Sequence, residues 1–582
     1  MGIRLSRGVA ASALILAACV AAVAPAAAAT ADIDAAISSG DFAGCQTALA
    51  ERLAGKLPAD AAGVTVAAVE QLVADPAMRT ALGQWQFIAK LGADKLAAFA
   101  KGGPANAEFL AWILKSPDVM DAFLLAAVPT GFAKRDENSY GIDAAALGIW
   151  KTIHDADPDA KSGMCLRLAM ATALAPPPAQ SGYSKLAIEP LARYRHFRAA
   201  AQAGELAENF KNLTVWEYSK IVCADQSDAE LAWGRQMIDE FRPDLRDGAR
   251  VVEMVSSVWR RNSPVPYTGM QAMLQGGGKC GPRSTFGVFI NRANGIPAIG
   301  VAQPAHACVA WRAVDGTWQV GYGKGWGASR LDGVTGPEFV EGVTARASVK
   351  YFALVEHARW LGTAAATTAA GKEKGAAVLA LAQKMMRESP ASVGDLSKSF
   401  RPEEAEADPG ASGASTATAP ATAAQPPAGP PQPAKAVDGV IRVTSAAFSK
   451  TDGEGMWGGP RGVLRGRSRG TDGEFLVHFP QAQKNCWAEY LVDAPQKGVY
   501  EIVVTASAVN DGQILEAGSE HYNKTAFVRV PMSHGLWAAA PPAEIKLNEG
   551  VQTVRIATMP NQRGVSVLSF QLRPKPAPEP AP

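Results

Sequence analysis

The stretch "QGGGKCGPRSTFGVFINRANGIPAIGV", residues 275–301, decides how the middle of this chain folds. Three glycines lead to Lys279 and Cys280, and apolar side chains then recur at the three- and four-residue spacing of a helix: Phe286, Phe289, Ile290 and Ala293. Proline is tolerated in the first turn of a helix, so Pro282 fits a helix that begins near Cys280. The sequence therefore predicts a cysteine at a helix N-terminus, directly after a flexible loop.

A thiol in that position is well placed for chemistry. The helix dipole and the free N–H groups of the first turn favour a thiolate. The same N–H groups can hold the oxyanion that forms when a carbonyl is attacked. Residues 276–278 are glycines that let a substrate approach closely, and Gln275 is a candidate oxyanion donor, the alternative being a solvated loop glutamine. The other interpretations of Cys280 are a buried structural cysteine and a disulfide to Cys308, which would abolish nucleophilicity.

His306 is the candidate base. It opens a strand-like run, "HACVAWRA", at residues 306–313. Alternation along a strand puts His306, Cys308 and Ala310 on one face. A cysteine on a helix that faces a histidine on a strand is a workable nucleophile–base arrangement.

These elements resemble the core of the transglutaminase-like superfamily. The resemblance rests on the cysteine-bearing helix, the "RANGIPA" turn at 292–298, the strand that opens with "HA", and a following strand with Trp318. It covers roughly residues 250–330 and implies a papain-like α+β fold with thiol acyl transfer, that is, peptide or amide hydrolysis or transamidation. The family usually carries an aspartate a few residues past the tryptophan, whereas this chain has "WQVGYGKGW" at 318–326.

The departure from the family leaves two hypotheses. Gly321 or Tyr322 occupies the place of the carboxylate, while Asp315 lies in a hairpin turn and Asp332 comes well beyond. In the first hypothesis Tyr322 or a backbone carbonyl orients His306, and the protein is a cysteine acyltransferase or peptidase. Loss of an orienting group typically costs orders of magnitude in rate. The second hypothesis is therefore a catalytically degenerate scaffold that acts in binding, adhesion or matrix assembly.

The flanking regions predict a multidomain protein. Residues 30–240 have helical spacing and form an all-α domain, in which Ser227 and Glu230 make a capping box. Residues 213–222, "LTVWEYSKIV", fit either a helix or a strand. The transglutaminase-like domain is expected at 241–362. It is followed at 363–436 by an alanine-rich helix and a linker of proline, alanine and glycine.

The C-terminal region, 437–574, alternates in short β-like runs and predicts a β-sandwich, with a disordered tail at 575–582. Its "GVYEIVV", "VP…GLW" and "LNEGVQTVRI" elements resemble carbohydrate-binding modules of the galactose-binding-like jelly-roll type. Because sugar rings stack on aromatic faces, this resemblance makes Trp537 and Trp457 candidate glycan-binding residues, with Asn561 as a hydroxyl partner. Trp487 is a further candidate, although a buried core residue is the favoured interpretation there.

The N-terminus predicts export. Residues 1–29 read as a secretory signal peptide, with two arginines before an apolar run that ends in small residues. A retained membrane anchor is one alternative, and lipidation of Cys19 in "LAAC" is another. Each interpretation makes the mature protein extracytoplasmic. In an oxidising compartment one or two disulfides are expected, most naturally among Cys45, Cys165 and Cys223.

Composition excludes other classes. The net charge of the 582 residues is +2, so nothing indicates nucleic acid as a partner. The widely spaced cysteines predict no zinc site, and no cofactor is expected. The leading interpretation is a secreted or surface-anchored bacterial protein that acts on a peptide or protein substrate, with a sandwich that binds polysaccharide or cell-wall glycan.

Overall fold

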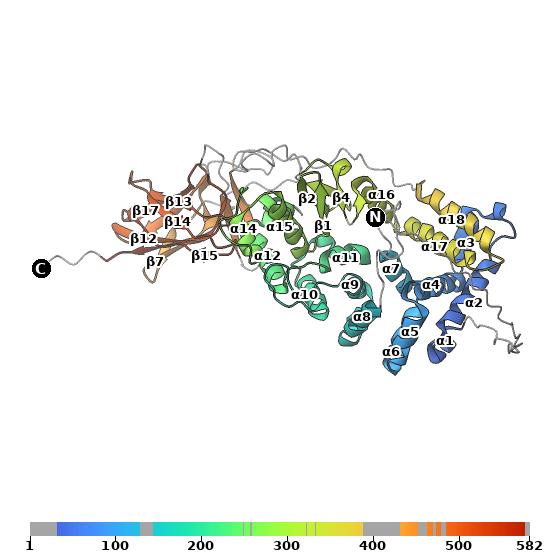
Figure 1. Ribbon diagram of the computed structural model, residues 1–582. Helices are drawn as coiled ribbons and strands as arrows, with labels where there is room; N and C mark the ends of the chain where they lie inside the picture. Colours follow the sequence, from blue (N-terminus) through green and yellow to red (C-terminus); the bar gives the residue numbers. More distant parts are fainter. Residues whose placement is uncertain are drawn as a thin grey trace, which may run out of the picture.

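The computed structural model describes the following residues: 32–127, 144–247, 250–256, 259–321, 323–331, 333–387, 431–451, 462–469, 473–478, 485–560 and 562–576. The molecule is elongated, with helices at one end, a small sheet in the middle and a β-sandwich at the other end (Figure 1). The predicted signal segment, including Cys19, and most of the predicted linker lie outside the described residues. Within them, no helix has the length and apolar character to cross a bilayer.

The N-terminal region is helical, as predicted. Its elements are α1 (Ile33–Ser39), α2 (Phe42–Gly55), η1 (Ala61–Gly63), α3 (Val66–Ala74), α4 (Pro76–Leu91), α5 (Ala93–Lys101), α6 (Pro104–Leu114), α7 (Pro117–Ala126), α8 (Ala144–Ala156), η2 (Pro158–Lys161), α9 (Gly163–Leu174), α10 (Pro190–Gln202), η3 (Glu208–Asn212), α11 (Val215–Val222) and α12 (Asp228–Phe241). The capping box of Ser227 and Glu230 begins α12. The ambiguous segment 213–222 is the helix α11, because Thr214 and Glu217 form a second capping box there.

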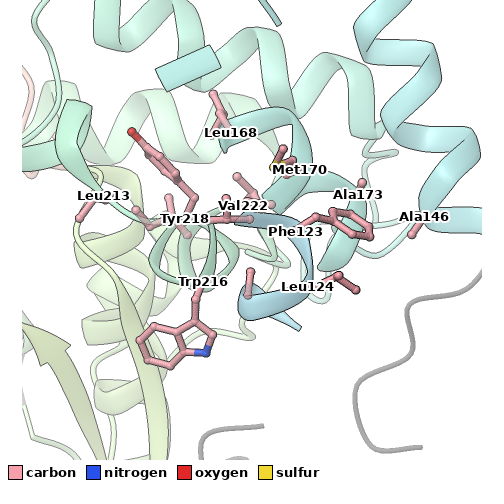
Figure 2. Packing of buried hydrophobic residues seen from close by; sticks show 14 of the residues in the cluster. Phe123, Leu124, Ala146, Leu168, Met170, Ala173, Leu213, Trp216, Tyr218 and Val222 are labelled. Atoms are coloured by element: carbon pink, nitrogen blue, oxygen red, sulfur yellow. The ribbon is translucent and has the colours of Figure 1, made fainter. Parts of the chain in front are cut away.

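Large apolar side chains fill the space between these helices. Figure 2 shows part of this core, where Phe123 of α7, Leu168 of α9 and Tyr218 of α11 come together. The ring centroid of Trp216 on α11 lies 5.6 Å from that of Trp318 in the middle sheet. The helical region therefore shares its core with the sheet.

The chain returns to the N-terminal helices after the middle sheet. Helix α16 (Gly336–Ala347) packs beside the middle sheet, and the returning elements are α17 (Val349–Ala366) and α18 (Lys372–Arg387). Helix α17 packs on α2, α4 and α18. His357 of α17 approaches Asp121 of α7 through Nε2 at 3.0 Å, and Arg79 pairs with the same carboxylate at 2.6 Å. The segment from 349 to 387 therefore completes the helical domain, whereas the sequence had placed it partly in the middle domain and partly before the linker.

The middle unit combines a short helical stretch with a sheet. Its elements are α13 (Pro243–Asp247), η4 (Val251–Ser256), α14 (Met270–Gly276), α15 (Cys280–Ala293), β1 (Ala298–Gln303), β2 (His306–Arg312), β3 (Trp318–Gly321), η5 (Trp326–Ala328), β4 (Arg330–Leu331) and β5 (Val334–Thr335). Among the described residues the strand order is β3-β2-β1-β4-β5, with antiparallel neighbours. Helix α15 packs against β2 and β1. The predicted turn at Asp315 joins β2 to β3, with its carboxylate accepting from the Thr317 N–H at 2.9 Å. Assignment of this unit to the papain-like fold stays a prediction.

The C-terminal region is a two-layer β-sandwich, as predicted. Its elements are β6 (Ala434–Val437), β7 (Val440–Thr444), η6 (Ser445–Ala447), β8 (Lys450–Thr451), β9 (Val463–Arg467), β10 (Glu474–His478), β11 (Trp487–Ala494), β12 (Gly498–Ser507), β13 (Gln513–Ser519), β14 (Ala526–Val530), β15 (Ala538–Ala539), β16 (Ala543–Leu547), β17 (Gly550–Thr558) and β18 (Val565–Pro574). One layer contains β16, β12, β18, β10 and β9, and the other contains β14, β13, β17 and β11. Alternate side chains of both layers form a core of their own.

The sandwich is docked on the C-terminal end of α12. Ser566 donates to the Phe241 carbonyl at 2.6 Å, and Ser468 donates to Asp239 at 2.6 Å. Trp233 of α12 donates through Nε1 to the His534 carbonyl at 3.1 Å. These bonds fix one layer of the sandwich against the same helix that packs on α15.

Candidate functional site

Cys280 is the first residue of α15, as the sequence predicts. Its side chain is half-buried, and Lys279 precedes it in extended conformation. Because Pro282 has no N–H, the free backbone donors at this helix start belong to Cys280 and Gly281. A thiol in this position lies beside the positive end of a fourteen-residue helix.

The fold brings the start of α15 next to the start of β2. Ser284, one helical turn after Cys280 and on the same face, donates to the Ala307 carbonyl at 2.7 Å. His306, the half-buried residue before Ala307, is opposite Gln303 in the β1–β2 hairpin. The structure therefore places the predicted nucleophile and the predicted base at neighbouring ends of two packed elements.

Cys308 shows that the two thiols are close without being bonded. Cys308 is fully buried on β2, and burial raises the pKa of its thiol to about 12, with nearby Cys280 adding to the shift. Both cysteines are free, so the alternative disulfide between them is absent.

The disulfides expected among Cys45, Cys165 and Cys223 are also absent, and each of these residues is a free thiol. Cys45 lies inside α2, Cys165 lies in α9, and Cys223 follows α11. Burial raises the pKa of the Cys45 thiol to about 11, consistent with a core residue.

Gln303 organises the loop that follows β3. Its Nε2 donates to Ser329 Oγ at 2.8 Å and to the Gly325 carbonyl at 3.1 Å, while its Oε1 accepts from the Lys324 N–H at 2.8 Å. A Cβ added at Gly323 would overlap this Oε1 and lie 3.1 Å from the Cys308 sulfur. The space beside β2 is thus filled by an amide and a thiol.

The glycines before Cys280 have a packing role. A Cβ on Gly276 would meet Ser263, and one on Gly278 would lie 2.7 Å from the Tyr267 hydroxyl. Tyr267 itself donates to the Gly277 carbonyl at 2.6 Å. The segment 263–267 of the chain itself therefore packs closely against these glycines, in the space that was predicted from the sequence for a substrate.

Gln275 lies in the last turn of α14 rather than in a loop, and it is half-buried. The start of α14 is fixed by Glu230, whose Oε1 accepts from the Met270 N–H at 3.0 Å. Glu230 is the capping residue of α12, so one carboxylate ties α12 to the helix that precedes the thiol.

The predicted glycan residues divide into two groups. Trp537 lies at the docked side of the sandwich: its ring contacts Phe475 edge-on with centroids 4.8 Å apart, and its backbone N–H donates to the Glu240 carboxylate of α12 at 2.6 Å. Its indole nitrogen is buried. Trp457 and Asn561 lie outside the described residues, as does Tyr322, the candidate orienting residue.

Trp487 differs from its interpretation as a core residue. It is half-buried on the outward face of β11, because the alternate residues of this strand, not Trp487, enter the core. The Arg555 guanidinium stacks on its ring at 4.3 Å and also pairs with Glu489. The core prediction failed because every second side chain of "WAEYLV" enters the core, and the first of these is Ala488 rather than Trp487.

Ser284 and Gln303 were missed by the sequence reasoning. Ser284 had a usable signal, since it lies one helical turn after Cys280. Gln303 had no such signal in the sequence, because it bonds to residues that lie 22 and 26 positions later in the chain. Among the described residues, no cluster of three or more histidine, cysteine or acidic side chains is arranged to hold a metal.

Comparisons with known proteins bear on the sandwich alone. No family model and no curated protein matches the chain. The C-terminal CBM6 of a marine laminarinase from Zobellia galactanivorans is 12% identical, covering 23% of this chain and 98% of that one, with a TM-score of 0.19. A CBM6 from Cellvibrio mixtus lichenase 5A in complex with cellotriose is 15% identical over 23% and 97% of the two chains, with a TM-score of 0.19. A β-1,3-glucan binding CBM6 from Bacillus halodurans is 14% identical over 24% and 99%, with a TM-score of 0.20.

Proposed function

We propose that the protein is an extracytoplasmic, thiol-dependent enzyme that hydrolyses or transfers the acyl group of a peptide amide, with Cys280 as nucleophile and His306 as base. The observation that carries this proposal is the bond from Ser284 to the Ala307 carbonyl, which holds the start of α15 against the start of β2. A helix-capped thiol beside a histidine is the arrangement that activated cysteines require.

The chemistry follows from these positions. His306 accepts the Cys280 proton, and the sulfur attacks the amide carbonyl to form a tetrahedral oxyanion. The N–H groups of Cys280 and Gly281 face that oxyanion. Collapse expels the amine, which takes the proton from His306 and leaves a thioester. Water, or a second amine, then attacks the thioester and regenerates the thiol.

The alternative is a degenerate scaffold, and Gly323 is the observation that favours it. The loop after β3 has no room for a side chain at Gly323, because Gln303 and Cys308 fill the space. If the protein is an enzyme, a backbone carbonyl or Tyr322 must orient His306. A catalytically degenerate protein needs no orienting group.

The rate at which Cys280 is alkylated distinguishes the thiol-dependent enzyme from the degenerate scaffold. Each free thiol is followed by peptide mapping during treatment with iodoacetamide at neutral pH. The proposal predicts that Cys280 reacts at least about tenfold faster than an unstructured thiol. Half-buried Cys165 and Cys223 serve as internal controls in the same sample. A Cys280 rate equal to that of a model thiol would favour the scaffold.

For the sandwich, we propose glycan binding on the outward face of the layer β14-β13-β17-β11. The strand register aligns Phe527, Glu516, Ala557 and Trp487 in one row across four strands. Phe527 is 56% exposed. Three strand spacings separate the backbone positions of Trp487 and Phe527 by roughly 14 Å. Between them lie Ala557, which is buried, and Glu516, whose carboxylate also accepts from the Thr525 hydroxyl at 2.6 Å. Sugar rings offer apolar faces to such aromatics and hydroxyls to such a carboxylate.

Binding to insoluble cell-wall glycan and to β-glucan tests this face. Trp487→Ala and Phe527→Ala should each weaken retention by the intact protein. Val437→Ala removes an equally exposed apolar side chain from β6 and is the control. Retention that is the same in all three variants would rule out this face.

A further inference from the structure

We propose that the thiol site selects an acidic peptide, because cationic side chains gather around it without acidic partners. This inference rests on the proposed acyl transfer at Cys280. It names the chemical class of the acyl donor, which carries carboxylates next to the scissile amide.

The charge of the middle unit differs from that of the whole chain. The whole chain is nearly neutral, with a net charge of +2. Between residues 259 and 331, however, the described residues contain a single acidic side chain, Asp315. Asp315 lies in the β2–β3 turn, where it caps Thr317, at the opposite end of β2 from His306.

Three of the cations flank Cys280 on its N-terminal side. Lys279 is the exposed residue directly before it. Trp259 forms a parallel bridge with Gly278, and the Arg260 N–H donates to the Gly278 carbonyl at 3.2 Å. This pairing places Arg260 and the exposed Arg261 alongside the approach to Cys280. Trp259 is itself 42% exposed, so it offers an apolar surface between these charges.

Two more cations lie at the His306 end of the sheet. The exposed Lys324 donates through Nζ to the carbonyl of Pro304, which is in the β1–β2 turn next to His306. The exposed Arg330 on β4 is opposite Ala302 of β1, and Ala302 is opposite Ala307 of β2. Both side chains therefore lie at the same end of the sheet as the candidate base.

These five cations, Lys279, Arg260, Arg261, Lys324 and Arg330, make no ion pair within the described residues. Glu338, the acid next along the chain among the described residues after Arg330, already accepts from the N–H and the hydroxyl of Thr335, both at 2.8 Å. Asp332 lies outside the described residues. Unpaired charges of one sign on the segments that flank Cys280 and His306 create a positive field there.

The chemistry of the site favours a peptide over other polyanions. A thiol beside a base acts on acyl groups, and the uronic acids of an acidic polysaccharide offer no scissile amide between them. Arginine guanidinium groups bind carboxylates bidentately, which suits Arg260, Arg261 and Arg330 to glutamate- or aspartate-like side groups. A field of this kind raises association rates by about 10- to 1,000-fold at low salt.

The test uses two alkylating peptides of equal size, iodoacetyl-Glu-Glu-amide and iodoacetyl-Gln-Gln-amide, on the full-length protein. The rate at Cys280 is read by peptide mapping and divided by the rate of each probe with a free model thiol. The proposal predicts that the acidic probe is preferred by about tenfold or more at 20 mM salt. The preference should shrink at 500 mM salt, because exposed charges are then screened.

Charge-neutralising variants locate the effect. The double variant Lys324→Gln with Arg330→Gln should lose most of the preference while keeping its rate with the neutral probe. Lys497→Gln, an exposed cation of the sandwich, is the matched control and should keep the preference. Equal rates for both probes in the unmodified protein, or a preference that the double variant retains, would overturn the proposal.

The two proposals fail differently in this design. If Cys280 is alkylated no faster than a model thiol but still reacts faster with the acidic probe, the result counts against acyl transfer and supports the cationic surface. If Cys280 is alkylated faster than a model thiol but at equal rates by both probes, the result supports acyl transfer and contradicts the acidic substrate. Polygalacturonate and polyglutamate of equal charge are added as competitors of the neutral probe. If polygalacturonate slows alkylation of Cys280 more than polyglutamate does, the preferred ligand is an acidic polysaccharide and the peptide proposal is wrong.

Discussion

Ser284→Ala tests whether the contact between α15 and β2 aligns the thiol with its base. The variant removes a bond of 2.7 Å to the Ala307 carbonyl in a largely buried place. Such a bond contributes about 1 kcal/mol, so the variant should lose about that much stability. If the same bond holds Cys280 beside His306, the reactive arrangement loses a similar free energy, which corresponds to about a fivefold slower alkylation of Cys280.

The assay needs a control for the loss of stability alone. Ser219→Ala is suitable, because this buried serine donates to the Trp216 carbonyl at 2.6 Å within α11, away from the site. Both variants should lower the unfolding midpoint by a similar amount. Only Ser284→Ala should slow iodoacetamide at Cys280. Equal Cys280 rates in the two variants would refute the positioning role of Ser284.

The remaining predictions concern packing, docking and pH. Gly323→Ala should cost about 1–3 kcal/mol in thermal unfolding, since its Cβ overlaps Gln303, whereas Gly327→Ala, with open space around it, should cost little. Asp239→Asn weakens the acceptor of two bonds from the sandwich, so limited proteolysis should release the sandwich faster than from the unmodified protein. Burial lowers the pKa of His478 to about 4, so the unfolded state binds more protons between pH 4 and about 6.5. Stability of the sandwich should therefore fall as the pH drops through this window, by on the order of 3 kcal/mol, and His478→Leu should flatten the dependence.

The helix start at Cys280 was predictable because the signals are local. Apolar spacing and a proline in the first turn are properties of a short segment, and the structure begins α15 at that residue. The same holds for the strand at His306, the turn at Asp315 and the cap at Ser227. Alternation and turn residues were likewise sufficient to predict the sandwich.

Contacts between distant parts of the chain were not predictable. Helix α17 returns to α2 and α4, and its His357 contacts Asp121, more than two hundred positions earlier. Trp537 looked like a sugar platform because an isolated tryptophan in a loop gives no sign of its partner. Its ring packs on Phe475, and its backbone N–H donates to Glu240 of α12, almost three hundred positions earlier. Disulfides were expected from the predicted export of the protein, yet Cys45, Cys165 and Cys223 are free thiols.

The roles of Cys280 and His306 are tested most directly by comparing Cys280 alkylation in the unmodified protein and in His306→Ala. If His306 activates the thiol, iodoacetamide should modify Cys280 at least about tenfold faster than a model thiol. His306→Ala should remove this excess while the rates at Cys165 and Cys223 stay the same. A Cys280 rate that equals the model thiol in the unmodified protein, or that is unchanged in His306→Ala, would contradict these roles.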